Sequence, residues 1–578
     1  MAAERPFRRP QQEEYDVAIL GGGLAGLTLG LQLTRARPGT TVFVAEKRPG
    51  PAPEAAFKVG ESTVELSCHY FGEVIGLKDH LERDQVPKCG LRFFFPADDN
   101  SDISQRVEYG VPFFPPVPSF QLDRGRFENE LARRNLEAGV DLVQGAFVDE
   151  VDLEGNPHHV TIVQGGQGGE RTTVRARWVV DASGRSFILK HKLGLLEPNE
   201  HAVNSSWFRL AGGLNIEDWV DEDDDEWFGR MKQRGWRRFS TNHLCGEGYW
   251  VWLIPLSSGP ISIGIVADPR FHPWERINTL EGALDWLREH EPQLAGALDT
   301  RRDQVEDFLV CEHFSYGCKQ VYSSDRWCLT GEAGPFLDPF YSPGSDAIAM
   351  GNTFTTDLIT RDLDGEDIAE RADAHNDLFL KYYKASLVMY EGQYGVWGNP
   401  QVMTAKITCN NIFYWSTMAI LFFHSKFIDR EFAATVWKDV NRIWRLNARL
   451  EQLFREWHAL ENREWRRAYV PTLAFPPLGA RHLDLEQTFD DDALRAKIAE
   501  NAELMEAVAV AVFRKALDAL NGEVPDEQAK INPYAIGLRP ERWEEDGLFD
   551  GSGLSFAAAA ERTPGLENLW MERIAQPA

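Results

Sequence analysis

The 578-residue chain has few cysteines and no long apolar run. Its seven cysteines include no C-x-x-C pair, so we expect neither a disulfide framework nor a bound metal, and the pattern is typical of a reducing, cytoplasmic compartment. The longest apolar stretch, Ile412 to Phe423, is interrupted by Ser416 and Thr417. It is too short to span a bilayer and predicts a buried helix.

Basic residues are also scarce. Lysine and arginine total 61 against 89 acidic residues, a formal net charge of −28. This excess argues against a nucleic-acid partner and against binding to an anionic membrane. Residues 1–14 are polar and lack the apolar core of a secretory signal, so we expect a disordered N-terminus.

A dinucleotide-binding motif opens the ordered part of the chain. An apolar strand is predicted at residues 15–20, followed by G-x-G-x-x-G and a helix at 27–34. The glycines allow a tight turn and close backbone approach to a pyrophosphate, and the helix N-terminus supplies N–H groups. The predicted contacts of this loop are Gly21, Gly23, Leu24, Ala25 and Gly26.

A second apolar strand at 41–45 ends at Glu46, which follows Gly26 by 20 residues. An acidic side chain is expected there to bind the ribose hydroxyls. The alternative, an ordinary βαβ unit without a ligand, explains the glycine spacing less well. The other glycine cluster, at 165–169, precedes no helix and predicts a hairpin turn. The sequence therefore predicts one dinucleotide site.

Later segments resemble those of aromatic-hydroxylase-type flavoproteins and indicate FAD. Residues 181–185, D-A-S-G-R, resemble the D-x-x-G-R turn of that group, and we expect Asp181 to belong to the cofactor site. Gly331 and Glu332 resemble the G-D segment under the ribityl chain, with glutamate in place of aspartate. Arg124 matches the arginine on the phosphate or ribose side, although a surface arginine is the alternative.

Residues 250–255, W-V-W-L-I-P, resemble the W-x-W-x-I-P signature of flavin-dependent halogenases. Trp250 and Trp252 are two residues apart on a predicted strand, so both point to the same face. A pair of core aromatics is the alternative interpretation. The resemblance implies that the pair lies beside the flavin and keeps the substrate away from it.

Two further segments resemble the same family. Residues 58–62, K-V-G-E-S, resemble its basic-x-G-E-S segment near the flavin, which assigns Lys58 to the cofactor site. Lys88, before the aromatic run 93–95, matches the family's essential lysine. The alternative is a lysine at the start of a strand that reaches solvent.

Residues 336–344, F-L-D-P-F-Y-S-P-G, match the F-x-x-P-x-x-S-x-G tunnel segment of the family. The resemblance assigns a catalytic role to Ser342 and places Gly344 at the flavin. A helix is predicted from Ser345, and its N-terminus favours an anion such as a halide. The family's turn offers N–H groups to the halide; here only Gly344 and Ser345 can donate, because Pro343 has none.

Two neighbouring residues also differ from the family pattern. Tyr341 stands where tryptophan-specific members have a glutamate, so the chain resembles the other members, and free tryptophan is not the expected substrate. Asp346 replaces a small or apolar residue and would repel a halide if it pointed inward. Pro343 and Asp346 favour the alternative of an FAD-dependent monooxygenase or dehydrogenase on the same fold, whereas Lys88 and the tryptophan pair oppose it.

The resemblance implies a halogenase in secondary metabolism that uses reduced FAD, O2 and chloride or bromide. Its substrate is expected to be an electron-rich small molecule, free or tethered to a carrier protein. With one dinucleotide site, the chain would need a separate flavin reductase. The oxidant, a hypohalous acid, would travel to Lys88, whose ammonium can lose a proton when desolvated. A non-catalytic flavin-binding scaffold is the third alternative.

The predicted fold is α/β: a Rossmann-type FAD-binding domain of the aromatic-hydroxylase type, a substrate β-sheet layer and a C-terminal helical region. Residues 15–370 are expected to form the FAD-binding and catalytic module, with the substrate sheet at about 200–320. Apolar residues spaced three, four and seven apart predict an amphipathic helix within a mainly helical domain at 371–540: Val436, Val440, Ile443, Leu450, Phe454 and Trp457. Residues 541–578 are expected to form a tail.

Overall fold

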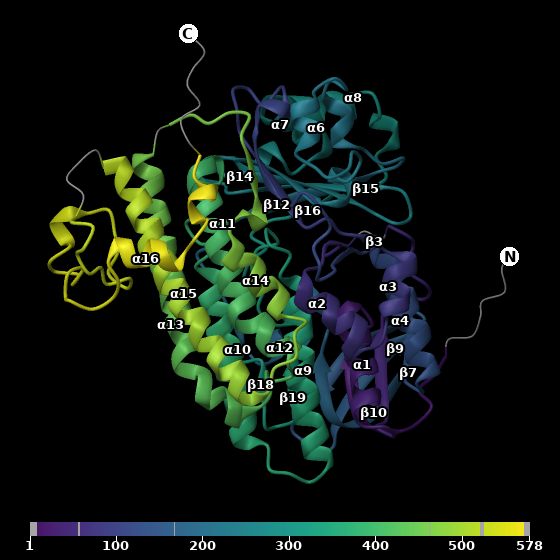
Figure 1. The fold of residues 1–578 in the computed structure, drawn as a ribbon. Coiled ribbons are helices and arrows are strands. Elements are labelled where there is room, and N and C mark those ends of the chain that lie inside the picture. Colours follow the sequence, from purple (N-terminus) through teal and green to yellow (C-terminus); the bar gives the residue numbers. More distant parts are fainter. Residues whose placement is uncertain (1–7, 56–57, 167, 462, 521–524, 572–578) are drawn as a thin grey trace.

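The computed structural model describes residues 8–55, 58–166, 168–461, 463–520 and 525–571. Parts of the predicted N-terminal and C-terminal segments, residues 1–7 and 572–578, lie outside the described residues. Figure 1 shows the two β-sheets one above the other, with the C-terminal helices packed along one side of both. This arrangement confirms the predicted fold class.

The first sheet carries the glycine motif. Five of its strands are parallel: β7 (Asp141–Gln144), β2 (Val42–Glu46), β1 (Glu14–Leu20), β10 (Glu170–Asp181) and β19 (Trp327–Leu329), in that order. Beyond β19 lies the antiparallel β18 (Tyr322–Ser323). β8 (Ala146–Asp152) and β9 (His158–Gln164) extend the sheet from β10. Every residue of β1 from Val17 to Leu20 is fully buried, as expected for a parallel strand covered on both faces.

Helices α1 (Leu24–Ala36), α4 (Arg124–Glu137) and α9 (Gly344–Leu363) cover this sheet. The predicted hairpin is present, because β9 and β10 pair antiparallel on either side of the glycine cluster, of which Gln167 is outside the described residues. Short elements complete this part of the chain: α2 (Glu65–His69), α3 (Lys78–Asp84), α5 (Ile188–Lys192), β11 (Leu196–Glu197) and β17 (Gly317–Cys318). The part of the molecule built on the first sheet is thus assembled from segments spread over the first 363 residues.

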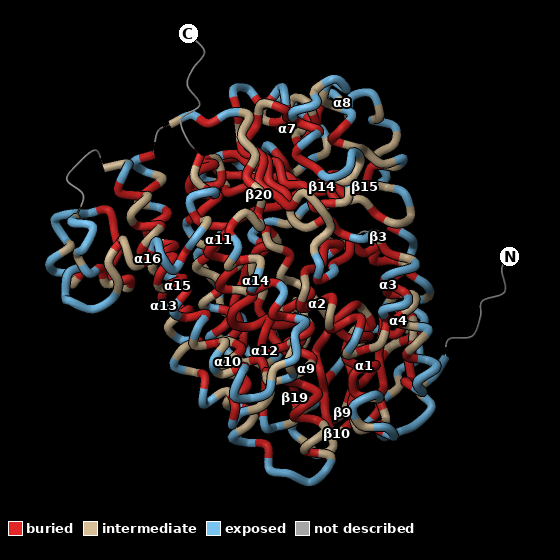
Figure 2. Tube along the Cα trace, in the orientation of Figure 1, coloured by how far each residue is buried: buried red, intermediate tan, exposed pale blue. Residues whose placement is uncertain are grey.

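The second sheet has eight strands and draws on residues outside the predicted 200–320 range. Its order is β16 (Leu309–Cys311), β12 (Asn204–Leu210), β15 (Ile261–Ala267), β14 (Tyr249–Pro255), β13 (Thr241–Gly246), β4 (Leu91–Phe95), β5 (Val107–Gly110) and β20 (Tyr469–Pro471). Helices α6 (Asp225–Gly229), α7 (Leu280–His290) and α8 (Pro292–Asp299) cover its outer face (Figure 1). Its strands are among the most continuously buried segments in Figure 2. A two-stranded pair, β3 (Val86–Pro87) with β6 (Phe120–Gln121), lies between the two sheets.

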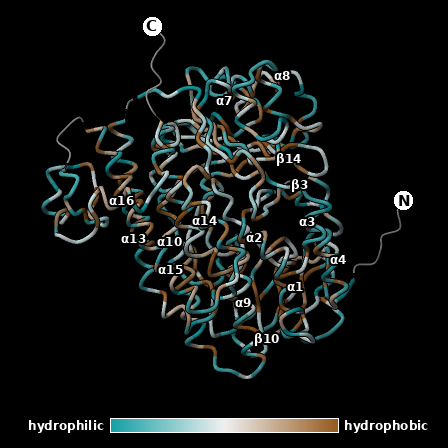
Figure 3. The backbone as a smooth tube through the Cα atoms, viewed as in Figure 1, coloured by the Kyte–Doolittle hydropathy of each residue, from teal (hydrophilic) through white to brown (hydrophobic). Residues whose placement is uncertain are grey.

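The C-terminal region is mainly helical. It comprises α10 (Ala369–Leu387), α11 (Pro400–Tyr414), α12 (Ile420–Phe423), α13 (Arg430–Leu460), α14 (Pro476–Asp484), α15 (Asp491–Ala516) and α16 (Phe556–Arg562). The six residues that predicted an amphipathic helix all lie on α13 and are all buried, which confirms that prediction. Figure 3 shows hydrophobic and hydrophilic residues alternating along these helices. Within the described part of the chain, we find no helix both long and apolar enough to cross a membrane.

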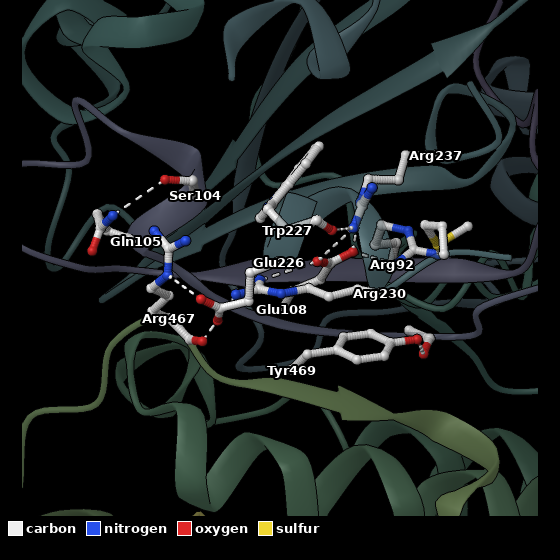
Figure 4. Close-up of polar contacts among 12 residues, drawn as sticks. Arg92, Ser104, Gln105, Glu108, Glu226, Trp227, Arg230, Arg237, Arg467 and Tyr469 are labelled. Carbon is white, nitrogen blue, oxygen red and sulfur yellow. Dashed lines mark hydrogen bonds and ion pairs between the residues drawn. The ribbon is translucent and has the colours of Figure 1, made fainter. Parts of the chain in front are cut away.

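A buried charge cluster ties the C-terminal region to the second sheet. The Glu108 carboxylate on β5 accepts hydrogen bonds from Arg92 on β4, from Arg237 at 2.9 Å and from Arg230 at 3.3 Å (Figure 4). Arg230 also donates to the backbone carbonyl of Arg467, just before β20. Burial alone would raise the pKa of Glu108, but the guanidinium groups of Arg237 and Arg92 outweigh it and lower the pKa to about 2.

We predict that Glu108→Gln lowers the free energy of unfolding by about 3–5 kcal/mol, because it leaves buried guanidinium groups without their carboxylate. The contribution of the ionised carboxylate is present above its unfolded pKa of about 4.5 and is lost as the pH falls through about 2. Urea unfolding at neutral pH measures the difference. The control is Glu289→Gln, which removes an exposed pair with Arg276 and should cost under about 1 kcal/mol. A similar effect of both variants would contradict the prediction.

Candidate functional site

A cavity of about 730 Å³ lies where the glycine loop of the first sheet faces the second sheet. Its size falls within the range of roughly 300–1,000 Å³ that is usual for small-molecule and cofactor sites. Most of the predicted cofactor residues line it: Gly21, Gly23, Leu24, Ala25, Glu46, Lys58, Arg124, Gly331, Glu332 and Gly344. The structure therefore brings together residues that are more than 300 positions apart in the sequence.

The glycine loop leaves room for a ligand where side chains would fill it. Gly21 has a φ of +116°, and a Cβ there would lie 2.5 Å from the Ala182 carbonyl oxygen. A Cβ on Gly26 would lie 2.0 Å from the Gly21 carbonyl oxygen, so this glycine is needed for packing of α1. A Cβ on Gly23, in contrast, would project into the cavity, with Lys58 Nζ nearest at 3.7 Å. The N-terminus of α1 begins at the next residue and favours an anionic group.

Charged side chains line the same end of the cavity. Glu46 accepts hydrogen bonds from the N–H groups of Gly22 and Arg48, both at 2.8 Å. Lys58 and Arg124 share one buried carboxylate, Glu128, at 2.8 and 2.7 Å. Burial would raise the pKa of Glu128, but these two cations lower it. Arg48 also lies 3.5 Å from Glu128, so three cations against the carboxylates of Glu128 and Glu46 leave a net positive charge at this wall, which suits the phosphates of a dinucleotide.

Asp181 does not line this cavity. Its carboxylate is buried, where burial raises its pKa, and it accepts hydrogen bonds from the N–H groups of Ser183 at 2.9 Å and Leu189 at 2.7 Å. Its predicted part in cofactor binding is therefore indirect: it shapes the turn whose residues Ala182 and Ser183 line the cavity. Glu332 does line the cavity, but its carboxylate is engaged by Arg185 at 2.8 Å.

Trp250 and Trp252 lie side by side on β14 and both line the cavity, as their spacing predicts. The indole N–H of Trp250 donates to the Tyr394 hydroxyl at 3.1 Å, and Tyr394 in turn donates to Asp338 at 2.6 Å. His201 contacts the same Asp338 oxygen at 2.8 Å. The sequence analysis missed this network, because its members come from four distant segments and no spacing connects them.

A second, smaller cavity of about 100 Å³ lies beside the first, and Pro343 lines both. Lys88 lines this second cavity and is 2% exposed, so it does not reach solvent. Its ammonium donates to Ser62 Oγ at 2.9 Å and to the Thr63 carbonyl at 2.6 Å. Burial lowers the pKa of Lys88 to about 8, partly offset by the nearby carboxylate of Glu65.

Two serines connect the cavities. Ser62 Oγ and Ser342 Oγ are 2.9 Å apart, and both serines line the first cavity. Lys88, which donates a hydrogen bond to Ser62, lines the second cavity. Ser342 has a φ of +61°, a left-handed conformation that side chains rarely adopt and that is common at functional sites. The hydrogen-bonded chain Ser342–Ser62–Lys88 therefore runs from one cavity to the other.

Helix α9 begins at this connection. Gly344 and Ser345 line the first cavity, and the N–H groups of a first helical turn have no partner within the helix. Asp346 does not line the first cavity; it faces the second, where it accepts hydrogen bonds from the Ser67 N–H at 2.9 Å and the Tyr414 hydroxyl at 2.7 Å. The sequence analysis expected Asp346 to repel a halide if it pointed toward the halide turn. Its contacts instead direct the carboxylate to the second cavity, away from the wall formed by Gly344 and Ser345.

A Rossmann-type sheet, a glycine loop open to a large cavity and cations placed for phosphates define a dinucleotide-binding flavoprotein. Comparison with known proteins identifies the cofactor and the class. The FAD binding domain family model matches residues 14–260. The flavin-dependent halogenase chlA of Dictyostelium discoideum is 27% identical over 432 residues, covering 70% of each chain.

Two further comparisons agree. The chlorinase of 1H-pyrrole-2-carbonyl-(peptidyl-carrier protein) from Pseudomonas fluorescens is 27% identical, covering 66% of this chain and 80% of that protein. The structure of halogenase PltM in complex with phloroglucinol and FAD has the same fold, with a TM-score of 0.60 and 16% identity over 87% of this chain and 96% of that one. The protein is an FAD-dependent enzyme of the oxidoreductase type, similar to the flavin-dependent halogenases.

The second and third glycines of the motif, Gly23 and Gly26, should respond differently to alanine. Gly23→Ala fills ligand space, so we expect FAD affinity to fall by about tenfold or more with unfolding free energy unchanged. Gly26→Ala meets the Gly21 carbonyl, so we expect the apoprotein itself to lose about 1–3 kcal/mol. FAD titration by fluorescence and urea unfolding of the apoprotein separate the two effects. Unchanged FAD affinity in Gly23→Ala would rule out this loop as the pyrophosphate site.

Proposed function

We propose that this enzyme is a halogenase that uses reduced FAD, O2 and chloride or bromide to halogenate an electron-rich small molecule in secondary metabolism. The observation that carries the proposal is the position of Lys88. It is buried in a separate cavity and linked to the flavin cavity through Ser62 and Ser342. An oxygenase that transfers oxygen directly from its flavin needs no lysine in a second chamber.

When bound, reduced FAD would supply the oxidising chemistry, converting O2 and a halide ion into a hypohalous acid. The residues of the chain would then separate and aim the reagents. Trp250 and Trp252 line the first cavity, where they would keep a bulky substrate from the flavin side. Gly344 and Ser345 would offer N–H groups to the halide.

Lys88 would hold the oxidant beside the substrate. A lysine whose pKa is lowered to about 8 by burial exchanges a proton near neutral pH far more readily than an exposed lysine. As the ammonium it donates a hydrogen bond to a hypohalous acid, and as the amine it can accept the halogen. Ser62 Oγ holds Nζ at the boundary of the two cavities in either form.

The substrate is a free small molecule or one tethered to a carrier protein. The carrier-bound alternative is supported by the pyrrole chlorinase among the relatives, whose name specifies a peptidyl-carrier protein. A separate flavin reductase would supply the reduced cofactor, since a single dinucleotide cavity is built by the glycine motif among the described residues.

We predict that Lys88→Met and Lys88→Arg each lower the rate of halogenation by about 100-fold or more, because neither can exchange a proton in this environment. FAD binding should be retained. The assay supplies chemically reduced FAD, bromide and an electron-rich arene, and detects brominated product by mass spectrometry. Lys190→Met is a matched control, because Lys190 is also buried with its pKa lowered to about 8 but lines neither cavity. Equal losses in both positions would refute the assignment.

The second candidate function is an FAD-dependent monooxygenase or dehydrogenase, and Pro343 is the observation that favours it. This residue stands at the turn before α9 and has no N–H to offer a halide. Its φ of −78° is one that any residue adopts, so replacement need not disturb the turn.

If the halide binds at this turn, Pro343→Ala should lower the KM for bromide by roughly tenfold, because it adds a backbone donor to an anion. KM is measured from the rate of bromination at varied bromide. Pro335→Ala, at another proline of the same cavity, controls for added chain flexibility. If neither variant responds to bromide and oxygenated product forms without halide, the monooxygenase is the correct assignment.

A further inference from the structure

The second cavity is shaped for a single aromatic ring. Eight of the residues that line it are aromatic, among them Phe93, Tyr109, Tyr341, Tyr382, Phe413 and Tyr414. Its volume of about 100 Å³ is of the same order as the roughly 150 Å³ of an engineered cavity that binds benzene. Flat rings pack well against such walls by stacking and edge contacts.

Acidic and basic side chains face this ring-sized space. Lys88 lies on one side, and the carboxylates of Glu65 and Asp346 also line the cavity. Glu65 is paired with His482 at 3.2 Å, and this pair lowers its pKa against the effect of burial. Asp346 has no cationic partner at salt-bridge distance among the described residues, so it is the carboxylate with the greatest tendency to take a proton.

Asp346 is fixed by two hydrogen bonds and can accept more. One oxygen receives the Ser67 N–H and the other receives the Tyr414 hydroxyl. A carboxylate has about four acceptor positions, so half of them remain for a further donor. The side chain is 1% exposed, and burial raises its pKa to about 7, although both hydrogen bonds act in the opposite direction.

We propose that Asp346 binds the hydroxyl of a phenol-type substrate and accepts its proton during halogenation. The proposal rests on the proposed halogenase function and specifies its substrate class and its base. The aromatic wall selects the ring, Asp346 selects its O–H group, and Lys88 in the same cavity presents the halogen to the ring.

The electron balance of the step is closed by the hypohalous acid. The substrate O–H bond breaks, its proton goes to Asp346, and the electron pair stays on the phenolate oxygen. A ring carbon of the phenolate then bonds to the halogen, the O–X bond breaks, and hydroxide leaves with the pair. Hydroxide takes the displaced ring proton and becomes water, while Asp346 returns its proton to the phenolate. The ring loses two electrons and the halogen gains them.

The groups that face Asp346 set its response to pH. They come from every element around it: Glu65 and Cys68 on α2, Lys88 after β3, Tyr382 on α10, Tyr414 on α11 and His482 on α14. The pKa values of Tyr382, Tyr414 and Cys68 are raised by burial, so these groups stay neutral near pH 7. Asp346 is thus an ionised carboxylate and a strong hydrogen-bond acceptor above about pH 7. It becomes protonated, and loses this acceptor strength, as the pH falls through that value.

Binding of phenol and of anisole to the protein loaded with oxidised FAD tests the proposal without turnover. Calorimetry at pH 8 should show phenol binding about tenfold tighter than its methyl ether, which has no proton to donate. Asp346→Asn keeps the volume but offers only a neutral acceptor, so the preference for phenol should fall by about fivefold or more. In the wild type, the preference should weaken as the pH falls through about 7.

Tyr414→Phe provides a second measurement if Asp346→Asn fails to fold. The Tyr414 hydroxyl lowers the pKa of Asp346, so its removal should move the pH midpoint of the preference upward. An unchanged preference in Asp346→Asn, an unmoved midpoint in Tyr414→Phe, or no binding of either ring to the wild type would overturn the proposal.

These measurements use no reductant, oxygen or halide, so they are separate from the halogenase test. If Asp346→Asn reduces the preference for phenol but the enzyme forms no halogenated product, the role of Asp346 in binding is supported and only the proposed halogenase function is rejected. If the enzyme halogenates phenols but Asp346→Asn leaves the preference for phenol unchanged, the halogenase function is supported and only the role of Asp346 is rejected.

Discussion

The contact between Ser62 Oγ and Ser342 Oγ is the point on which the two-cavity arrangement depends. It joins residues 280 positions apart, one after the first sheet's β2 and one at the turn into α9. Ser62 Oγ also contacts Thr241 on the second sheet at 2.8 Å and receives Lys88 Nζ. The Ser62 hydroxyl therefore contacts Thr241 of the second sheet, the ammonium of Lys88 and the turn that precedes α9. The left-handed backbone of Ser342 is tolerated because these contacts fix it.

The separation of the cavities follows from this contact. Because the turn 341–344 is anchored by Ser62, Tyr341 and Asp346 project to the second cavity, while Ser342, Gly344 and Ser345 face the first. Side chains this close in sequence can face two different cavities because a tight turn is followed at once by a helix. The same turn brings a helix N-terminus, which favours anions, to the first cavity, where Gly344 and Ser345 line the wall.

The sequence was sufficient for the parts of the fold that obey local rules. The strand, glycine loop and helix at 15–36, the tryptophan pair and the amphipathic α13 each follow from spacing within one segment. Contacts between distant segments could not be read in this way. β20 joins the second sheet by three residues, far too few for a periodicity signal. Asp181 shows the same limit, because its motif locates the turn but not whether the carboxylate faces the cavity or the core.

The function of the buried charges also depends on partners that sequence does not reveal. Glu108 and Asp346 are both buried carboxylates, yet Glu108 is surrounded by three guanidinium groups and has its pKa lowered to about 2, whereas the pKa of Asp346 is raised to about 7. The first is a permanent anion that holds β5 and β20 together. The second is a group that can exchange a proton at neutral pH, and it lies in the cavity that also holds Lys88. The two pKa values shift in opposite directions because Glu108 has guanidinium partners that outweigh burial, whereas Asp346 has only neutral hydrogen-bond donors among the described residues.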